Sequence, residues 1–369
     1  VSQPMYGHPT VAVLPACLAV SEWIGASGRA ALEAYIIGLE VAVKLGYIIN
    51  PAHYEKGWHA TCTLGTMGAA VAGAKLLGLN GEKLRNALAL AASQACGLQR
   101  NFGTMTKSFH AGRASENGVI AAFLASKGWT GDQAIMDGPR GFLNIFGGPR
   151  VEDEVTAGFL EKLGNPFDIE DPGIILKKYP SCAFTHPGID AALEITQMSQ
   201  YDARKIERVE AYLHDLADQI LNHRKPVTGL EAKFSIEGSL ALALLDGYVS
   251  SKSFHDEKVQ TDSIQSMIAR VVRKVDSCGA STEPKGFGPT TVKVYFGGGN
   301  VLEATVEKAK GTPENPLAPN EVREKYIDCC TGILPEKAIE ASLSLLKNME
   351  DLDDIRKLMQ CFQVKSEPH

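Results

Sequence analysis

The sequence has few aromatic residues, at 7% of the chain, and no apolar run approaches the roughly 18 residues that a membrane-spanning helix needs. It has no large excess of charge either, because 37 basic and 43 acidic side chains leave a formal net charge of -6. That balance gives no overall attraction to nucleic acid or to an anionic membrane. The N-terminus, Val-Ser-Gln-Pro, lacks the basic stretch and apolar core of a secretory signal. We therefore expect a cytoplasmic protein, or a mitochondrial one if the source is eukaryotic, that binds neither membrane nor nucleic acid.

Common cofactor, metal and nucleophile signatures are also missing. The sequence contains no H-E-x-x-H, no G-x-x-x-x-G-K-[ST] and no G-x-S-x-G. Its eight cysteines are scattered, without the spacing of a disulfide framework or a paired zinc knuckle. The adjacent pair Cys329 and Cys330 has no His nearby, so we expect it to serve packing. The sequence thus predicts reduced thiols and no metal.

The sequence does contain long helical patterns rich in small residues. Hydrophobic residues make up 44% of the chain and Gly occurs 36 times, which is typical of a globular protein with a large core. Spacings of three and four, broken by Gly, Pro and Asn, predict helices over Arg29–Ile49, Thr63–Leu79, Glu82–Leu98 and Ala111–Lys127. A Gly-rich loop over residues 97–107 is expected to lead into the last of these. We predict an Ala- and Gly-rich helical bundle.

The pattern changes near Pro166. Alternating segments at Val209–Leu213, Thr291–Phe296 and Val301–Val306 predict strands, the last two joined as a hairpin by Gly-Gly-Gly-Asn. Helical patterns return between them and again after Pro319. The predicted fold is mostly α, with a large all-helical domain of residues 1–173 plus 316–369 and a smaller inserted α+β lid domain of residues 174–315.

His and Lys residues beside Gly or Pro stand at the junctions that precede helices. They are His8, His59, Lys107 with His110, and Lys178 with Cys182 and His186. Free backbone N–H groups and the helix dipole favour negative charge at such places. Together these junctions predict a pocket for a small polycarboxylate.

Each of these residues has a structural alternative. A single His at a helix start more often caps the helix or lies at the surface than acts in catalysis. His110 is expected to be structural, because Lys107 fits the anion-binding role better. Lys178 could be a solvated neighbour of Lys177, and Cys182 a small buried apolar group.

At these residues the chain resembles the MmgE/PrpD family, whose members include 2-methylcitrate dehydratase, cis-aconitate decarboxylase and iminodisuccinate epimerase. The most specific matching segments are Gly7-His8-Pro9, Gly57-Trp58-His59, Gly103–Gly112, Lys178–His186, Glu231–Ser235 and Leu245-Asp246-Gly247. The resemblance implies a helical domain built from both ends of the chain, an inserted lid, homodimerisation and catalysis without a cofactor. It also implies a preceding segment with an acidic His-Ala-x-Asp-[FY]-Asp-Asp motif, so we expect the site residues seen here to be an incomplete set.

The family's reactions remove a proton or carbon dioxide next to a carboxylate, and the resulting negative charge needs fixed cations and donors. We predict His8 and His59 as the acid/base pair and Lys107 as the carboxylate anchor. The second domain is expected to contribute substrate contacts from Lys178, Cys182 and His186, with Arg224 as a bidentate clamp. Because these residues fall in both predicted domains, we expect the site to close between them.

The choice among reactions stays open in the sequence. A dehydratase-type lyase is preferred because it is the commonest assignment in the family. Residues 101–107 resemble the epimerase as well, and Cys182 stands where the decarboxylases are expected to carry His. A further alternative is a catalytically silent helical dimer, in which the small-residue helices serve packing alone.

Overall fold

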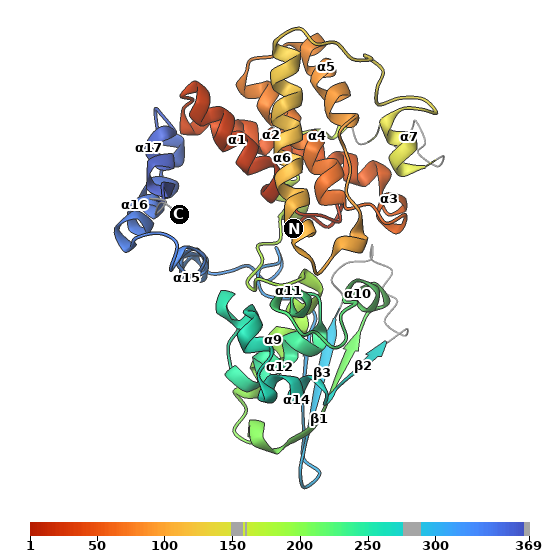
Figure 1. Ribbon diagram of the computed structural model, residues 1–369, viewed down its shortest axis with the longest axis vertical. Helices are drawn as coiled ribbons and strands as arrows, with labels where there is room; N and C mark the ends of the chain where they lie inside the picture. The colour runs from red at the N-terminus through yellow and green to blue at the C-terminus, as the bar shows by residue number, and fades with distance from the viewer. Residues whose placement is uncertain (149–157, 159–160, 276–288, 365–369) are drawn as a thin grey trace. The chain divides into compact units, whose positions relative to one another are not determined.

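The computed structural model describes residues 1–148, 158, 161–275 and 289–364. They divide into two compact units, which are treated separately below (Figure 1). Unit 1 comprises Val1–Asn101, Thr106–Ile174 and Cys330–His369, and unit 2 comprises Phe102–Met105 and Ile175–Cys329. Unit 2 thus extends to Cys329 where the sequence suggested residue 315. Glu321, on helix α15 (Pro319–Cys330), explains part of this difference, because it pairs with two lysines of unit 2.

The described part of unit 1 is helical. Its α-helices are α1 (Pro9–Ile24), α2 (Gly28–Ile49), α3 (Ala52–Glu55), α4 (Ala60–Leu76), α5 (Gly81–Ala92), α6 (Met105–Ser126), α7 (Phe142–Gly147), α16 (Glu336–Lys347) and α17 (Arg356–Met359). Short 3-10 or π turns lie at η1 (Gln99–Asn101), η2 (Ile169–Gly173), η7 (Met349–Asp351) and η8 (Gln360–Phe362). Because Met105, the first residue of α6, is grouped with unit 2, this helix begins where the two units meet in sequence. No helix among the described residues is long and apolar enough to cross a bilayer.

Glycines set the close packing of the bundle. A Cβ added at Gly68 of α4 would lie 2.5 Å from the carbonyl oxygen of Gly38 on α2, and a Cβ at Gly118 of α6 would lie 2.4 Å from Ala69. Such distances leave room only for hydrogen atoms, so larger side chains here would force the helices apart. The predicted small-residue helix is therefore confirmed, although it begins at Ala60 rather than Thr63.

Two predicted boundaries near the candidate site are wrong. Helix α5 ends at Ala92 instead of Leu98, and α6 begins at Met105, six residues before the predicted Ala111. The connection contains Gly97 and Gly103 at φ +111° and +85°, where residues with a side chain are strained. Lys107 therefore lies inside the first turn of α6 and not in a Gly-rich loop.

Unit 2 contains a four-stranded sheet in the order β2-β1-β3-β4. The strands are β1 (Ile206–Leu213), β2 (Val271–Val275), β3 (Thr290–Phe296) and β4 (Val301–Val306). The predicted β3–β4 hairpin is confirmed as an antiparallel pair, while β2 pairs parallel with β1 and was not predicted. These strands and the helices of unit 1 make a mostly α protein with a small sheet.

Helices pack on one face of this sheet. Figure 1 shows α9 (His186–Thr196), α12 (Ile236–Asp246) and α14 (Asp262–Ile268) beside the strands. Ile189 and Leu240 from these helices share a buried cluster with Val209, Val292 and Val294 from the strands. The shorter helices of the unit are η3 (Ala183–Thr185), η4 (Ala203–Lys205), α10 (Asp215–Ile220), α11 (Gly229–Ala232), η5 (Ser251–Phe254) and α13 (Asp256–Val259).

Candidate active site

His8 and His59 stand at the N-terminal ends of α1 and α4. Neither imidazole caps its own helix, so the capping alternative does not hold for them. Thr61, in the first turn of α4, joins the two ends: its Oγ1 accepts a hydrogen bond from the His8 backbone N–H at 3.0 Å and lies 3.1 Å from His8 Nδ1. A Cβ at Gly7 would lie 3.0 Å from the Thr61 nitrogen, so glycine permits this approach. The sequence brings the two predicted acid/base residues to one end of the bundle.

A third histidine joins them from α6. The Nδ1 atoms of His59 and His110 lie 3.0 Å apart, a hydrogen-bond distance. Both residues are buried, with 2% and 7% of their surface exposed. The His59 backbone N–H also donates to the Gly97 carbonyl at 3.0 Å. His110, expected to be structural because Lys107 seemed the better anion ligand, therefore contacts a predicted catalytic residue directly.

Lys107 supplies the positive charge of this group. It is half-buried and lies three residues before His110 on α6, so both residues share one face of the helix. Burial, then the Lys107 charge, then His110 lower the pKa of His59 to about 2. Burial and, secondarily, Lys107 also lower the pKa of His110. Both imidazoles are therefore neutral at pH 7, and the ammonium of Lys107 is the cation beside them.

In unit 2, the neighbouring lysines Lys177 and Lys178 have different partners. Lys178 pairs with Glu321 at 3.3 Å and lines a cavity of about 340 Å³ that does not include His186. Lys177 donates to the Ser181 carbonyl at 2.7 Å, and its charge acts on His186. His186 begins α9 and is 2% exposed. The charge of Lys177, and after it that of Lys325, thus acts on His186.

His186 itself is deeply buried. Its ring packs edge-on against Tyr179, with centroids 5.2 Å apart. Burial is the main cause that lowers its pKa well below the usual value, followed by the charge of Lys177. Its buried Nε2 hydrogen-bonds to no described residue. A neutral imidazole with an unused ring nitrogen is a group that could exchange a hydrogen bond with a ligand.

Comparison with known proteins shows the family of this chain. Residues 3–154 match the profile of the MmgE/PrpD N-terminal domain, and residues 179–355 match that of the MmgE/PrpD C-terminal domain. The chain belongs to the MmgE/PrpD family.

Several relatives in the family carry an activity in their names. The chain is 26% identical to cis-aconitate decarboxylase of Homo sapiens, over 98% of this chain and 75% of that protein. It is 28% identical to the enzyme of the same name from Mus musculus, over 94% of this chain and 72% of that protein. The chain is 25% identical to cis-aconitate decarboxylase of Aspergillus terreus, over 96% of this chain and 75% of that protein. The chain is accordingly an enzyme, and its relatives perform lyase chemistry.

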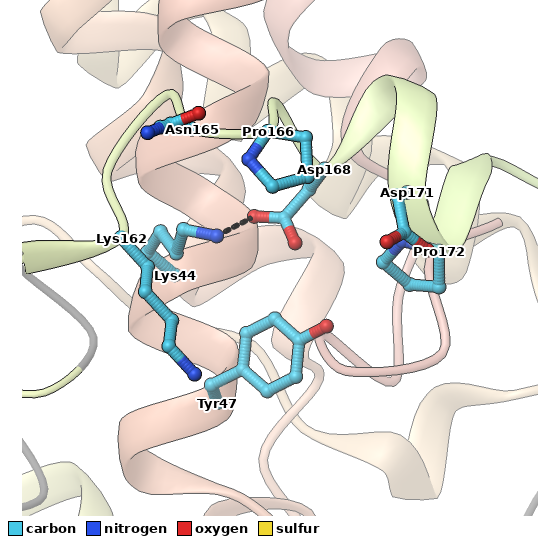
Figure 2. Close-up of a pocket in the computed structure, with 8 residues that line it drawn as sticks. All are labelled: Lys44, Tyr47, Lys162, Asn165, Pro166, Asp168, Asp171 and Pro172. Atoms are coloured by element: carbon cyan, nitrogen blue, oxygen red, sulfur yellow. Dashed lines mark ion pairs between the residues drawn. The ribbon is translucent and has the colours of Figure 1, made fainter.

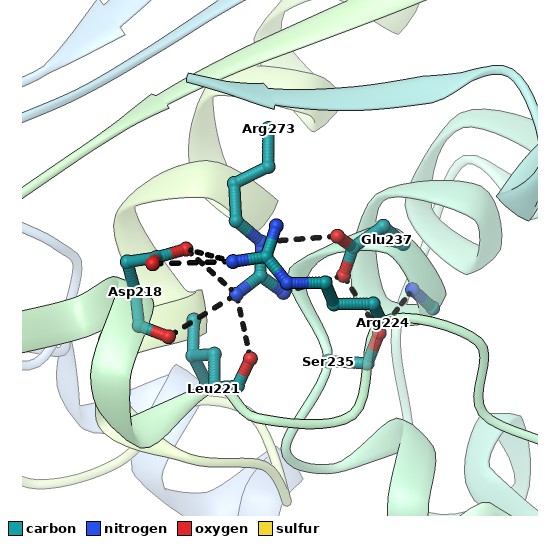
Figure 3. Close-up of polar contacts among 7 residues, drawn as sticks. Asp218, Leu221, Arg224, Ser235, Glu237 and Arg273 are labelled. Atoms are coloured by element: carbon teal, nitrogen blue, oxygen red, sulfur yellow. Dashed lines mark hydrogen bonds and ion pairs between the residues drawn. The ribbon is translucent and has the colours of Figure 1, made fainter. Parts of the chain in front are cut away.

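Two other residues predicted from the family resemblance have structural partners. The Cys182 backbone N–H donates to the Lys233 carbonyl at 2.8 Å, and its half-buried side chain packs against the core of unit 2. Arg224 places its guanidinium 3.0 and 3.2 Å from the two carboxylate oxygens of Asp218 (Figure 3). The predicted clamp thus already binds a carboxylate of its own chain, and its side chain is 59% exposed.

This MmgE/PrpD chain has another cavity, of about 450 Å³, in unit 1 (Figure 2). Lys44 of α2 lines this cavity and pairs with Asp168 at 2.8 Å and with Glu40 at 3.4 Å. Glu40 in turn accepts the backbone N–H groups of Gly164 and Asp168. The Lys44 charge is therefore used to hold the segment after residue 160 on α2. None of the predicted site residues lines this cavity.

Metal ligands do not gather near the histidines. Within residues 1–148, 158, 161–275 and 289–364, no group of three or more His, Cys, Asp or Glu side chains could hold a metal ion. His59 and His110 form a pair of possible ligands, but among the described residues no third ligand completes the group. Lys107 cannot coordinate a metal while it is protonated. As neutral imidazoles, His59 and His110 can accept or donate a proton.

Proposed function

We propose that this enzyme is a lyase that acts on a small di- or tricarboxylic acid and breaks a bond next to a carboxylate. His8 and His59 exchange the proton, and Lys107 binds the carboxylate. The observation that carries the proposal is the contact of the buried imidazoles of His59 and His110 beside Lys107, with His8 held at the same end of α4 by Thr61. A neutral imidazole can accept a proton, and a fixed ammonium stabilises the negative charge that forms on the substrate.

The N-terminal ends of three helices add to this field. His8, His59 and Lys107 belong to the first turns or caps of α1, α4 and α6, which have 16, 17 and 22 residues. Free N–H groups at these ends favour an anion. A substrate with several carboxylates suits a site that has one ammonium and three helix ends.

The chemistry requires a proton to be moved in each candidate reaction. In decarboxylation, the carbon–carbon electron pair stays on the substrate, carbon dioxide leaves, and a histidine N–H protonates the carbon. In dehydration, a histidine removes the proton from the carbon next to the carboxylate, and a second group protonates the departing hydroxyl so that water leaves. Lys107 faces the developing charge in both cases.

Decarboxylation of a cis-aconitate-like acid is the first candidate, because the named relatives share it. Dehydration of a 2-methylcitrate-like hydroxy acid is the second, because residue 182 is Cys where the decarboxylases are expected to carry His. The two are separated by their products. Released carbon dioxide from cis-aconitate supports the first, and appearance of an unsaturated acid with ultraviolet absorbance from 2-methylcitrate supports the second.

Epimerisation is tested in the same samples. Exchange of one α-proton with deuterated solvent, together with a change in optical rotation, would assign the chain to the epimerase reaction instead. No reaction with any of these acids by a folded protein would refute the proposed substrate class. We include homodimerisation in the proposal, and light scattering should give twice the mass of the chain.

Lys107→Ala tests the assignment of the site. The variant should lower kcat/KM by at least about a thousandfold, since removing a charge that acts on the transition state costs about 4 kcal/mol or more. Lys127→Ala, at the other end of α6 and exposed, is the matched control and should leave turnover unchanged. Equal kcat/KM in both variants would refute the role of Lys107.

In unit 2, we propose that Lys177 and His186 contribute substrate contacts. Lys177→Ala should raise KM, whereas Lys178→Ala should have a smaller effect because Lys178 already pairs with Glu321. A larger rise in KM for Lys178→Ala than for Lys177→Ala would instead assign substrate binding to Lys178.

A further inference from the structure

The hydrogen bond between His59 and His110 constrains where their protons lie. It joins Nδ1 to Nδ1 at 3.0 Å, and both residues are buried. A hydrogen bond needs one hydrogen, so one of these Nδ1 atoms carries it and the other accepts it. A neutral imidazole has a single N–H. Consequently the two Nε2 atoms are of opposite kinds, one with a lone pair and the other with a hydrogen.

The alternative is that the His59–His110 pair carries an extra proton and a positive charge, which its surroundings disfavour. A proton shared as imidazolium would place a second positive charge beside Lys107 in a buried site, and both histidines have their pKa lowered by burial first and by Lys107 next. Among the described residues, the charges of Lys107 and His110 lower the pKa of His59, and the charge of Lys107 lowers that of His110. The neutral pair with one shared hydrogen is the form present near pH 7.

The surroundings of His110 restrict the movement of its imidazole. Five residues later on the same helix, Ser115 donates its hydroxyl to the Ala12 carbonyl of α1 at 2.5 Å, which anchors α6. On the other side lies Gly97, at which a Cβ would be 3.5 Å from His110 Nδ1 and 2.9 Å from the Cys62 Cβ. The imidazole of His110 is therefore confined between α4 and the Gly97 backbone, with little freedom to turn away from His59.

We propose that His110 is a positioning residue that holds His59 in the tautomer protonated at Nδ1. His59 Nδ1–H then donates to His110 Nδ1, and the Nε2 lone pair of His59 is left to accept the substrate proton. The Nε2 of His110 carries its own hydrogen. The assignment of direction rests on the proposed function with His59 as the histidine that takes up a proton, as dehydration requires; in decarboxylation His8 is then the histidine whose N–H protonates the carbon.

Nitrogen NMR of the protein labelled with ¹⁵N-histidine tests this without any substrate. The expected spectrum has His59 protonated at Nδ1 and His110 at Nε2 near pH 7, with the signals assigned by single substitutions. In His110→Phe, which fills the space without a hydrogen-bonding nitrogen, His59 should become a mixture of both tautomers. His59 protonated at Nε2 in the unsubstituted protein, or a spectrum of His59 unchanged in His110→Phe, would overturn the proposal.

Kinetics provide the second readout. His110→Phe should lower kcat by about 10- to 100-fold, as loss of a group that orients a reacting side chain does, while KM changes less than about twofold. In His110→Asn, the amide oxygen lies where Nδ1 lay and can accept from His59, so most of kcat should return. A loss of kcat in His110→Asn as large as in His110→Phe would refute the hydrogen-bonding role.

His53→Asn is the control for simple destabilisation. His53 is another fully buried histidine of unit 1, bound to the Thr63 hydroxyl at 2.7 Å and near the Phe146 carbonyl at 3.2 Å. Its substitution should destabilise the fold but leave the His59 tautomer and kcat unchanged. If His53→Asn lowered kcat as much as His110→Phe, the effect of His110 would be structural. Absence of activity with every acid would refute the proposed function, and the NMR result would still decide on the tautomer.

Discussion

Arg273 of strand β2 is the residue whose loss should destabilise unit 2 most clearly. Its side chain is 2% exposed and binds both carboxylate oxygens of Glu237, at 3.0 and 2.6 Å (Figure 3). It also donates to the Asp218 carboxylate at 3.0 Å and to the Leu221 carbonyl at 2.6 Å. One guanidinium thus joins β2 to α12 and to the end of α10.

The expected cost of Arg273→Met follows from what it leaves behind. Glu237, with a side chain 5% exposed, would lose its cation and keep only the Ser235 hydroxyl as a donor from this group. Breaking a buried pair by removing one partner costs about 3 to 5 kcal/mol. The Leu221 carbonyl loses a donor as well, at about 1 kcal/mol or more. Since these costs overlap, we expect a loss of about 4 kcal/mol in the free energy of unfolding.

Arg224→Met is the matched comparison. Arg224 binds the same Asp218 carboxylate, but its side chain is 59% exposed, so its ion pair is worth about 1 kcal/mol or less. The assay is hydrogen exchange of the β1 amides measured by mass spectrometry, which reports on unit 2. The double variant Arg273→Met with Glu237→Gln removes both charges and should recover about 2 kcal/mol relative to Arg273→Met. Equal losses for Arg273→Met and Arg224→Met, or no recovery in the double variant, would refute the reasoning.

Three further predictions concern protons, thiols and metals. Burial lowers the pKa of His53 to about 4, and burial with Lys107 lowers that of His59 to about 2, so both stay neutral when folded while the unfolded chain takes up protons below about pH 6.5. Stability is therefore full above pH 6.5 and is lost on acidification, by about 3 kcal/mol per histidine at pH 4, which urea unfolding at pH 7 and pH 4.5 should show; a flat dependence would contradict it. Burial, followed by its contact with Cys96, raises the pKa of the Cys62 thiol to about 12, so maleimide should label exposed Cys96 and leave Cys62 unmodified in the folded protein, as peptide mapping can establish. Dialysis against a chelator should leave turnover unchanged, and activity that returned only with added zinc, iron or magnesium would reveal a metal site.

Local sequence pattern was sufficient for much of the fold. The small residues of α4 occur on every side of the helix, which is expected of a helix buried all round, and the structure buries nearly all of it. The hairpin was predictable because β3 and β4 alternate in burial and Gly298 and Gly299 supply the positive φ angles of the turn. In both cases the signal lies within a few residues of the element it predicts.

The missed elements have weak or misleading local patterns. The first turns of α6 carry Met105 and Phe109, which are 80% and 61% exposed, so their apolar side chains do not mark a buried face. Strand β2 has Arg273 and Lys274 between valines, so its sequence lacks the apolar pattern of a buried strand. The Arg273 side chain is nevertheless buried, because it forms ion pairs rather than apolar contacts. Neither arrangement can be derived from hydrophobic periodicity alone.

The sequence predicts candidate site residues, but it does not predict which of them contact one another across long stretches of chain. His59 and His110 are 51 residues apart, and their contact depends on how α4 and α6 pack. Lys177 and Lys178 are adjacent, and the sequence does not say that Glu321, far along the chain, pairs with Lys178 while the charge of Lys177 acts on His186. The motifs point to segments of the chain, and the contacts between distant residues can be seen only in the folded protein.

The electrostatics of the unit 1 site involve a compromise between binding and proton transfer. Protonated histidines beside Lys107 would attract a polycarboxylate more strongly, but they would have no lone pair to accept a proton. Burial keeps His59 and His110 neutral, so the attraction for the anion is left to Lys107 and to the free N–H groups at the helix ends. A bound polycarboxylate would bring negative charge near His59 and raise its pKa toward the range useful for catalysis. In the proposed function, substrate binding itself thus completes the acid/base role of His59, because the negative charge of the substrate raises the pKa that burial lowers.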